Sequence, residues 1–272
     1  PPAANGFNRG VYSLLLSGGA LYAGGGFQAY RDVTNSALAL AKLDPASGAL
    51  DTTFSPPGQD ANGFDDTVYA IAAKDDHLIV GGDFTRYRGV VDSAKSIAKI
   101  NATTGVLDTA FSPPSGNGFD STVYAVAVHG DSAFVGGSFN SYRSTLELGY
   151  VAKLSLTDGA LDTVFTAPGA NSGFSDTVYA LTMSGGSLYA GGEFLGYRGN
   201  DSNANYLAKL NPATGERDTV FTPAGASNGY GGVNSLSPYR DSILAGGDFA
   251  NCQDSTCFQN ATRFNRNTRA PQ

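Results

Sequence analysis

Four Tyr-Arg pairs follow one another at regular intervals of 57, 55 and 55 residues. Tyrosine offers an amphipathic ring and arginine a rigid fork of donors, so the pair is suited to holding a sugar ring or a carboxylate. A structural role is the alternative, with the arginine bonded to a neighbouring repeat and the tyrosine packing its loop, because structural needs recur as regularly as sites. The candidate residues are Tyr30, Arg31, Tyr87, Arg88, Tyr142, Arg143, Tyr197 and Arg198.

A second recurrent motif, Asn-Gly-Phe, also indicates ligand binding. An aromatic ring beside an amide gives a neutral sugar one stacking surface and one bidentate polar partner. The alternative is an aromatic plug between repeats, with Asn-Gly forming a turn. The candidates are Asn5, Phe7, Asn62, Phe64, Asn117, Phe119, Phe174 in a Ser-Gly-Phe variant, and Asn228 with Tyr230 in an Asn-Gly-Tyr variant.

The repeated acids predict structure rather than catalysis. Four aspartates stand in a Leu-Asp-Thr-x-Phe or Arg-Asp-Thr-x-Phe context, which favours a carboxylate accepting backbone N–H bonds at a turn; they are Asp51, Asp108, Asp162 and Asp218. A glycosidase needs two carboxylates with different roles at one bond, whereas repetition places equal acids in equivalent positions. No catalytic residue is predicted. One alternative stays open, because Asp83, Glu193 and Asp248 share a position that holds Gly26 and Ser138 in the other copies.

The sequence predicts no cofactor and no metal site. His77 and His129 have no cysteine or histidine partner at metal-ligand spacing. Nucleophile-elbow, phosphate-loop, dinucleotide and calcium-loop motifs do not occur in their required contexts. Calcium binding at Asp65-Asp66 or Asp75-Asp76 remains an open alternative.

The two cysteines, Cys252 and Cys257, lie five residues apart, and Cys252 stands where the other copies have the tyrosine of Tyr-Arg. A disulfide between them would close a small loop and predicts an oxidising, extracellular or cell-surface location. Free thiols in a reducing compartment are the alternative.

Internal repetition organises the whole chain. The segment VYAIAAKDDHLIVGGDFTRYRG returns with conservative changes, so that repeats begin near Val11, Val68, Val123, Val178 and Val233. We expect residues 1–272 to form a single domain. Each repeat is predicted to hold four short antiparallel strands. The first two are joined by a two-residue hairpin turn, and the second ends in Gly-Gly-x-Phe, where paired glycines favour a bulge or a close neighbouring backbone. The fourth is the Leu-Asp-Thr-x-Phe segment.

Four-stranded units of this length, repeated five times, predict an all-β, five-bladed β-propeller. The succession Val-Tyr-Ala, Gly-Gly-Asp-Phe, Ala-Lys-Leu-Asn and Gly-x-Leu-Asp-Thr-x-Phe resembles the delta-60 type β-propeller repeat of bacterial surface and secreted proteins. The fifth copy lacks the Leu-Asp-Thr-x-Phe segment, so a shortened fifth blade is expected.

In such a meander the long loops after the second and fourth strands share one face, and we expect function there. The formal net charge of −7 argues against nucleic acid as a partner, and no apolar run is long enough for membrane insertion. We expect a non-catalytic, multivalent binding or adhesion module that recognises glycan or protein on a cell surface. The alternatives are a structural spacer or protein-docking module in a larger chain, a homo-oligomer, and a glycan-cleaving enzyme.

Overall fold

The computed structural model describes residues 6–56, 62–112, 118–170, 172–199, 204–221, 231–248, 252–253, 256–257 and 260–268, without the side chains at positions 34, 252, 253, 256 and 257. The chain divides into two compact units. The first comprises Pro1–Val128 with Leu156–Ala160, and the second comprises His129–Ser155 with Leu161–Gln272. Each unit is described by itself.

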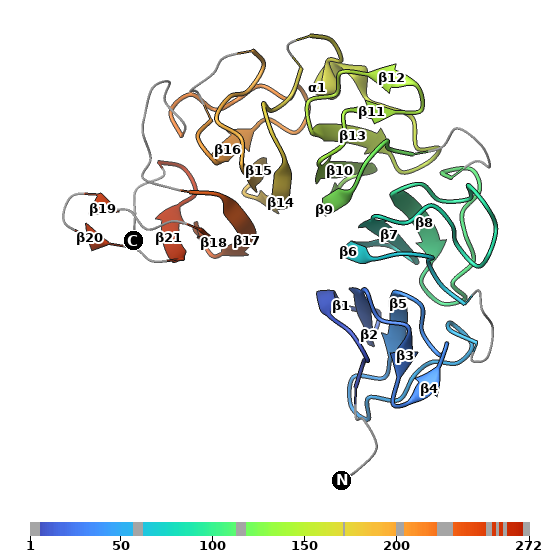
Figure 1. The fold of residues 1–272 in the computed structure, drawn as a ribbon. Coiled ribbons are helices and arrows are strands. Elements are labelled where there is room, and N and C mark those ends of the chain that lie inside the picture. The colour runs from blue at the N-terminus through green and yellow to red at the C-terminus, as the bar shows by residue number, and fades with distance from the viewer. Residues whose placement is uncertain are drawn as a thin grey trace. The chain divides into compact units, whose positions relative to one another are not determined.

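The first unit holds two antiparallel sheets of the same design (Figure 1). In one, β2 (Ala20–Gly25) pairs with both β1 (Val11–Ser17) and β5 (Leu40–Leu43). In the other, β7 (His77–Gly82) pairs with β6 (Val68–Lys74) and β8 (Ile97–Asn101). Strand β9 (Val123–His129) begins the next repeat.

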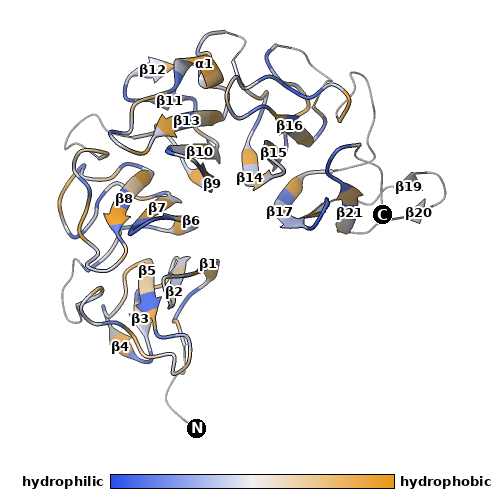
Figure 2. Cartoon of the chain, turned by 180° about the vertical axis from the view of Figure 1, so that it is seen from behind, coloured by the Kyte–Doolittle hydropathy of each residue, from blue (hydrophilic) through white to orange (hydrophobic). Residues whose placement is uncertain are grey.

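The second unit repeats this design. Strand β15 (Ser187–Gly192) lies between β14 (Val178–Ser184) and β16 (Leu207–Leu210), and β18 (Ser242–Gly247) lies between β17 (Val233–Tyr239) and β21 (Ala261–Asn265). Strand β10 (Ser132–Gly137) pairs with β13 (Val151–Ser155). The third strands β8 and β13 are coloured hydrophobic in Figure 2.

Short hairpins inside the long loops were not expected from the sequence. They pair β3 (Ala29–Tyr30) with β4 (Val33–Thr34), β11 (Ser141–Tyr142) with β12 (Thr145–Leu146), and β19 (Cys252–Gln253) with β20 (Thr256–Cys257). The two-residue turns after each first strand are confirmed, and the first residue of each has positive φ: Gly18, Asp75, Gly130, Gly185 and Arg240. A type I′ hairpin turn requires positive φ at both residues, which holds at Gly18-Gly19 and Gly185-Gly186.

The prediction of four-stranded blades is wrong, because each described sheet ends at its third strand. The Leu-Asp-Thr-x-Phe segments contribute one isolated bridge each, such as Leu43–Leu50 and Ile100–Leu107. After the bridge the aspartate side chain binds the backbone N–H groups two and three residues later, which curls the chain into a turn. In the third repeat this turn is the short helix α1 (Thr163–Thr166), with Asp162 as its N-cap.

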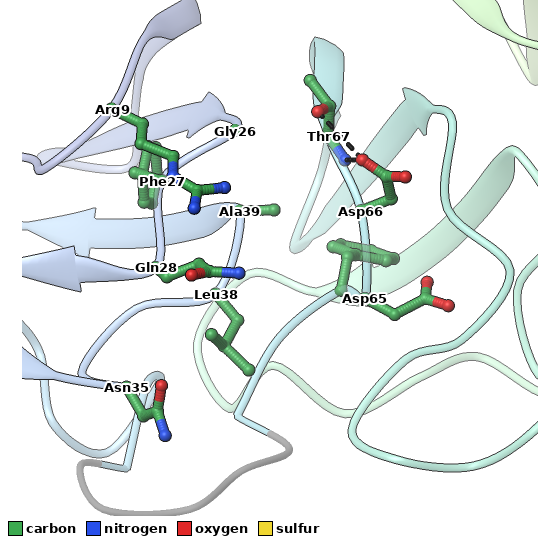
Figure 3. A pocket seen from close by; sticks show the side chains of 11 residues that line it. Arg9, Gly26, Phe27, Gln28, Asn35, Leu38, Ala39, Asp65, Asp66 and Thr67 are labelled. Atoms are coloured by element: carbon green, nitrogen blue, oxygen red, sulfur yellow. Dashed lines mark hydrogen bonds between the residues drawn. The ribbon is translucent and has the colours of Figure 1, made fainter.

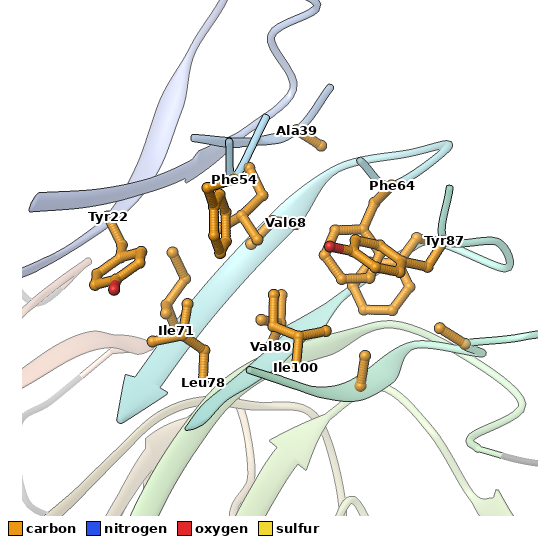
Figure 4. Packing of buried hydrophobic residues seen from close by; sticks show 14 of the residues in the cluster. Tyr22, Ala39, Phe54, Phe64, Val68, Ile71, Leu78, Val80, Tyr87 and Ile100 are labelled. Carbon is orange, nitrogen blue, oxygen red and sulfur yellow. The ribbon is translucent and has the colours of Figure 1, made fainter. Parts of the chain in front are cut away.

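The core lies between successive sheets, where the glycine pair is required. A Cβ at Gly81 would meet the Val123 side chain at 2.4 Å, and one at Gly82 would meet the Thr67 carbonyl oxygen at 2.2 Å. Both features predicted for the paired glycines, a close neighbouring backbone and a bulge, are confirmed, because β6 also has a register shift opposite them, between Val68 and Ala70. Figure 4 shows the resulting cluster, in which Tyr22 and Phe54 from the first repeat pack beside Val68 and other residues of the second.

Candidate functional site

A pocket of about 380 Å³ opens between the first two repeats, inside the first unit (Figure 3). The first repeat contributes the loop after β2, including Gly26, Phe27 and Gln28, together with Arg9, which precedes β1. The second repeat contributes residues 64–67, which lead into β6. These are the two kinds of long loop that the sequence analysis placed on one face. The size is within the range of small-molecule sites.

Gly26 creates the opening of this pocket. The next repeat has Asp83 at the same position, and the Asp83 carboxylate accepts a 3.0 Å hydrogen bond from the Thr122 hydroxyl across the second junction. Thr67 is the counterpart of Thr122 at the first junction, and its hydroxyl would lie 3.4 Å from a Cβ placed on Gly26. The space that a carboxylate fills at the second junction is therefore empty at the first.

The two donors on the rim come from the first repeat. The Arg9 guanidinium and the Gln28 amide extend toward Thr67 and Asp66 on the opposite side (Figure 3). Within the described part of the chain Arg9 has no ion-pair partner. Tyr12, which is 60% exposed, lies beside the opening, with a ring carbon 3.9 Å from the Cβ position of Gly26. This exposed ring provides an aromatic surface that the sequence analysis did not predict.

The acids of the second repeat are bound to its own loops. Asp65 accepts bonds from the backbone N–H groups of Thr85 and Arg86, both at 2.8 Å, and from the Thr85 hydroxyl at 2.8 Å. One oxygen of Asp66 accepts the N–H and hydroxyl of Thr67 at 2.6 and 3.1 Å. Figure 3 shows the Asp65 carboxylate directed away from Arg9 and Gln28. The donors of the first repeat therefore remain available to a ligand.

The Tyr-Arg pairs are placed as packing elements. The tyrosine rings are buried, and the Tyr87 hydroxyl donates to the Gly105 carbonyl at 2.6 Å. Burial raises the pKa of Tyr87 to about 12, although the Arg88 charge acts in the opposite direction. Arg88 donates to the Phe54 carbonyl of the preceding repeat at 2.8 Å. Arg198 makes the same contact with Phe165, also at 2.8 Å. The arrangement favours the structural alternative, although Tyr87 with Arg88 and Tyr30 with Arg31 also line the cavities beside them.

Asn-Gly-Phe is also placed in the packing between repeats. The Phe64 ring packs in a tilted arrangement against Phe84 and Tyr87, with centroid distances of 4.0 and 4.6 Å, and it also lines the pocket. The Asn62 amide is buried and bonds the Asn35 carbonyl at 2.5 Å and the Leu38 N–H at 3.2 Å, both in the first repeat. Phe7 and Phe174 stack in the same way, and Phe119 is fully buried. Asn5, Asn117, Asn228 and Tyr230 lie outside the described residues.

The structural interpretation of the repeated aspartates is confirmed. Asp108 caps the N–H groups of Ala110 and Phe111, and its second oxygen pairs with Lys99 at 2.8 Å. Partial burial alone would raise the pKa of Asp108, but the bonds from Lys99 and the backbone lower it overall. The same pKa shift occurs at Asp51, Asp162 and Asp218, each paired with a lysine nine residues earlier. These lysines were not predicted, although their constant spacing from the aspartates is visible in the sequence.

A second kind of cavity, which we call the outer grooves, lies beside the bridged segments. The groove of the second repeat measures about 310 Å³ and is lined by Val90, Val106 and Leu107 among others. That of the first repeat measures about 280 Å³, with Val33, Ala49 and Leu50 at the same places. Both are largely apolar, and Val33, Val90 and Val106 are each more than half exposed.

The remaining features are the cysteine pair, metal ligands and membrane-spanning helices. The register of β19 and β20 sets the Cα atoms of Cys252 and Cys257 opposite each other, but both side chains lie outside the described part. Across the described ranges, no three His, Cys, Asp or Glu side chains group as metal ligands, and no helix has the length and apolarity to span a membrane.

The sheets and the inter-repeat packing together define a β-propeller type of repeat. A family model described as "Domain of unknown function (DUF5122) beta-propeller" matches residues 19–54, 73–111 and 186–221. The chain is therefore an all-β repeat protein of the β-propeller class. No curated protein matches it.

Two solved structures support the same fold. The Neurospora crassa Pan2 WD40 domain aligns with a TM-score of 0.54 and 13% identity, over 96% of this chain and 64% of that one. The WD40 β-propeller domain of Doa1 aligns with a TM-score of 0.51 and 13% identity, over 93% of this chain and 62% of that one. The chain thus spans less than two thirds of each of these structures.

Proposed function

We propose that this chain is a non-catalytic binding module that recognises glycan through the pocket between its first two repeats. The observation that carries the proposal is the opening at Gly26, which is bordered by the Thr67 hydroxyl and leads to Arg9 and Gln28. Donors and acceptors at close spacing suit a ligand rich in hydroxyl groups. The exposed Tyr12 ring beside the opening supplies the apolar face that sugar rings pack against.

We further propose that the module works at a bacterial cell surface or in secreted form. Of the two junctions inside the first unit, the first has this opening at Gly26, whereas Asp83 occupies the equivalent position at the second. Avidity in adhesion would then come from several copies displayed on one surface, rather than from equivalent sites within one chain.

The finer features of the fold belong to the same proposal. We propose five blades of the delta-60 type, one for each of the repeats beginning near Val11, Val68, Val123, Val178 and Val233. We also propose a disulfide between Cys252 and Cys257, because residues directly opposite in antiparallel strands have Cα separations within the disulfide range.

Titration calorimetry with a panel of neutral and acidic mono- and disaccharides tests the binding proposal. The sharpest variant is Gly26→Asp, which introduces the residue of the second junction. The backbone of Gly26 is not left-handed, and its Cβ position makes only ordinary contacts, so the fold should tolerate the change. We expect the wild type to bind at least one sugar with a Kd on the order of a millimolar, and Gly26→Asp to weaken this at least about tenfold.

Equal thermal unfolding temperatures of the two proteins would show that the loss comes from a filled pocket. Absence of binding heat for every sugar at tens of millimolar, or equal binding by Gly26→Asp, would refute the proposed site.

Protein docking is the second candidate function, and the outer grooves favour it. Their aliphatic lining is present in the first two repeats, whereas the fourth has Glu216 and Arg217 where the second has Val106 and Leu107. Leu50 and Leu107 also pack against the core, but the fold accepts polar residues at these places, and the exposed Val106 suits contact with another protein.

A further inference from the structure

We infer that the pocket between the first two repeats is specific for a carboxylate-bearing sugar, such as a uronic acid residue of an acidic glycan. The inference rests on the proposed glycan-binding function and assigns the ligand a charge. It depends on a comparison of the two junctions inside the first unit, which share their backbone design and differ in a few side chains.

The second junction shows how a carboxylate is held at this place. There the Asp83 side chain occupies the space beside β9 and accepts the Thr122 hydroxyl at 3.0 Å. The first junction keeps the hydroxyl, as Thr67, but loses the acid, because Gly26 replaces it. The Thr67 hydroxyl donates its one proton to Asp66 at 3.1 Å, so a carboxylate brought by a ligand would enter the vacated space and be bound by Arg9 and Gln28 rather than by this hydroxyl.

The charges at the two junctions also differ in the required direction. Arg9 stands two residues before Val11, where the second repeat has Asp66 two residues before Val68. The position two residues before the first strand is thus acidic in the repeat that carries Asp83 and cationic in the repeat that carries Gly26. A guanidinium is the side chain best suited to bind a carboxylate in a bidentate manner, and Gln28 adds an amide donor on the same rim.

The nearby acids do not remove this preference. The Asp65 carboxylate is already bonded to Thr85 and the Arg86 backbone, and the Arg86 side chain lies 4.0 Å from it. Asp66 uses one oxygen to bond Thr67, and its other oxygen is suited to accept a sugar hydroxyl. An acidic sugar therefore matches both sides, with its carboxylate toward Arg9 and a hydroxyl toward Asp66.

Paired ligands that differ in one group test this inference: methyl glucuronide against methyl glucoside, and methyl galacturonide against methyl galactoside. Titration calorimetry at low salt should give the wild type at least about a tenfold preference for one uronide over its neutral partner. Arg9→Gln should abolish that preference, so that the uronide and its neutral partner bind with equal affinity. Arg9→Lys, which keeps the charge without the fork, should retain part of it.

Asp83→Gly is the matched control, because it opens the corresponding space at the second junction without adding a cation. In a Gly26→Asp background, Asp83→Gly should not restore uronide binding. Equal affinity for the uronide and its neutral partner would overturn the inference and leave the glycan-binding proposal intact. Binding of neither ligand, with binding of other sugars, would also overturn it, and binding of no sugar at all would overturn both.

Discussion

At the scale of single residues, the arginines of the Tyr-Arg motif differ in what they join. Arg88 bonds the Phe54 carbonyl of the preceding repeat at 2.8 Å and the Thr104 carbonyl of its own repeat at 3.2 Å. Arg31, in the first repeat, bonds only its own turn within the described residues, at the Ser47 carbonyl and 3.3 Å. The same motif therefore has an inter-repeat bond in one copy and only a local bond in another.

This difference gives a residue-scale prediction. Arg88→Gln should lower the free energy of unfolding by about 2 kcal/mol, because it removes a partly buried charged donor from two carbonyls. Arg31→Gln serves as the matched control and should cost less than half as much. Urea denaturation monitored by tyrosine fluorescence measures both. Equal losses would mean that the bond to the preceding repeat contributes nothing, and loss of sugar binding at constant stability in Arg88→Gln would restore the ligand interpretation of the motif.

At the scale of elements, the outer grooves lead to a prediction about docking. Val106→Glu with Leu107→Arg introduces into the second repeat the residues that the fourth already has at 216 and 217. Leu107 pairs through a single bridge with Ile100, as Arg217 does with Leu210, so we expect the unfolding temperature to fall by only a few degrees. If the grooves bind protein, crosslinking on cells that display the wild-type chain should capture a defined partner protein. That partner should be lost with the Val106→Glu, Leu107→Arg variant and retained with Gly26→Asp. A partner lost in Gly26→Asp alone would contradict docking at the grooves.

Some elements of each repeat could be predicted from the sequence and others could not. The first three strands follow from alternation and hairpin turns, so β6, β7 and β8 lie close to where the pattern predicts them. The predicted fourth strand does not form for a local reason. The Asp108 side chain accepts hydrogen bonds from the backbone N–H groups that a strand would have offered to its neighbour. An aspartate after a single apolar residue indicates this turn, and the pattern of hydrophobicity alone does not.

The face of the candidate site and one of its residues, Phe64, were predictable from the sequence, whereas Arg9 and Gln28 were not. Loop lengths placed function where the loops after β2 and before β6 meet, and the pocket lies there. The recurrent aromatics Phe64 and Tyr87 pack against each other, and Phe64 also lines the pocket. The pocket depends on departures from the repeat, Gly26 and Arg9, which are visible only when copies are compared position by position. In a repeat protein, constant residues mark the packing and exceptions mark the candidate site.

At the scale of the whole molecule, stability depends on the same few bonds made again in successive repeats. Capping aspartates with lowered pKa values occur in both units, at Asp51, Asp108, Asp162 and Asp218. Buried tyrosines whose pKa is raised to about 12 also occur in both, at Tyr87 and Tyr197. Small effects at each position therefore act together on the unfolding of each unit.

This repetition predicts loss of stability at both ends of the pH range. A lowered aspartate pKa contributes stability that is present above the unfolded value, near 3.9, and is lost as the pH falls through the folded value. A raised tyrosine pKa contributes stability that is present below about 10 and is lost as the pH rises toward 12. Calorimetric unfolding temperatures should therefore fall steeply below about pH 4 and above about pH 10.

Asp108→Asn keeps the capping oxygen and removes one acid, so its acid-side decline should be shallower than that of the wild type, with an unchanged alkaline side. An identical acid-side profile in the variant would exclude Asp108 and its Lys99 partner as a source of the decline.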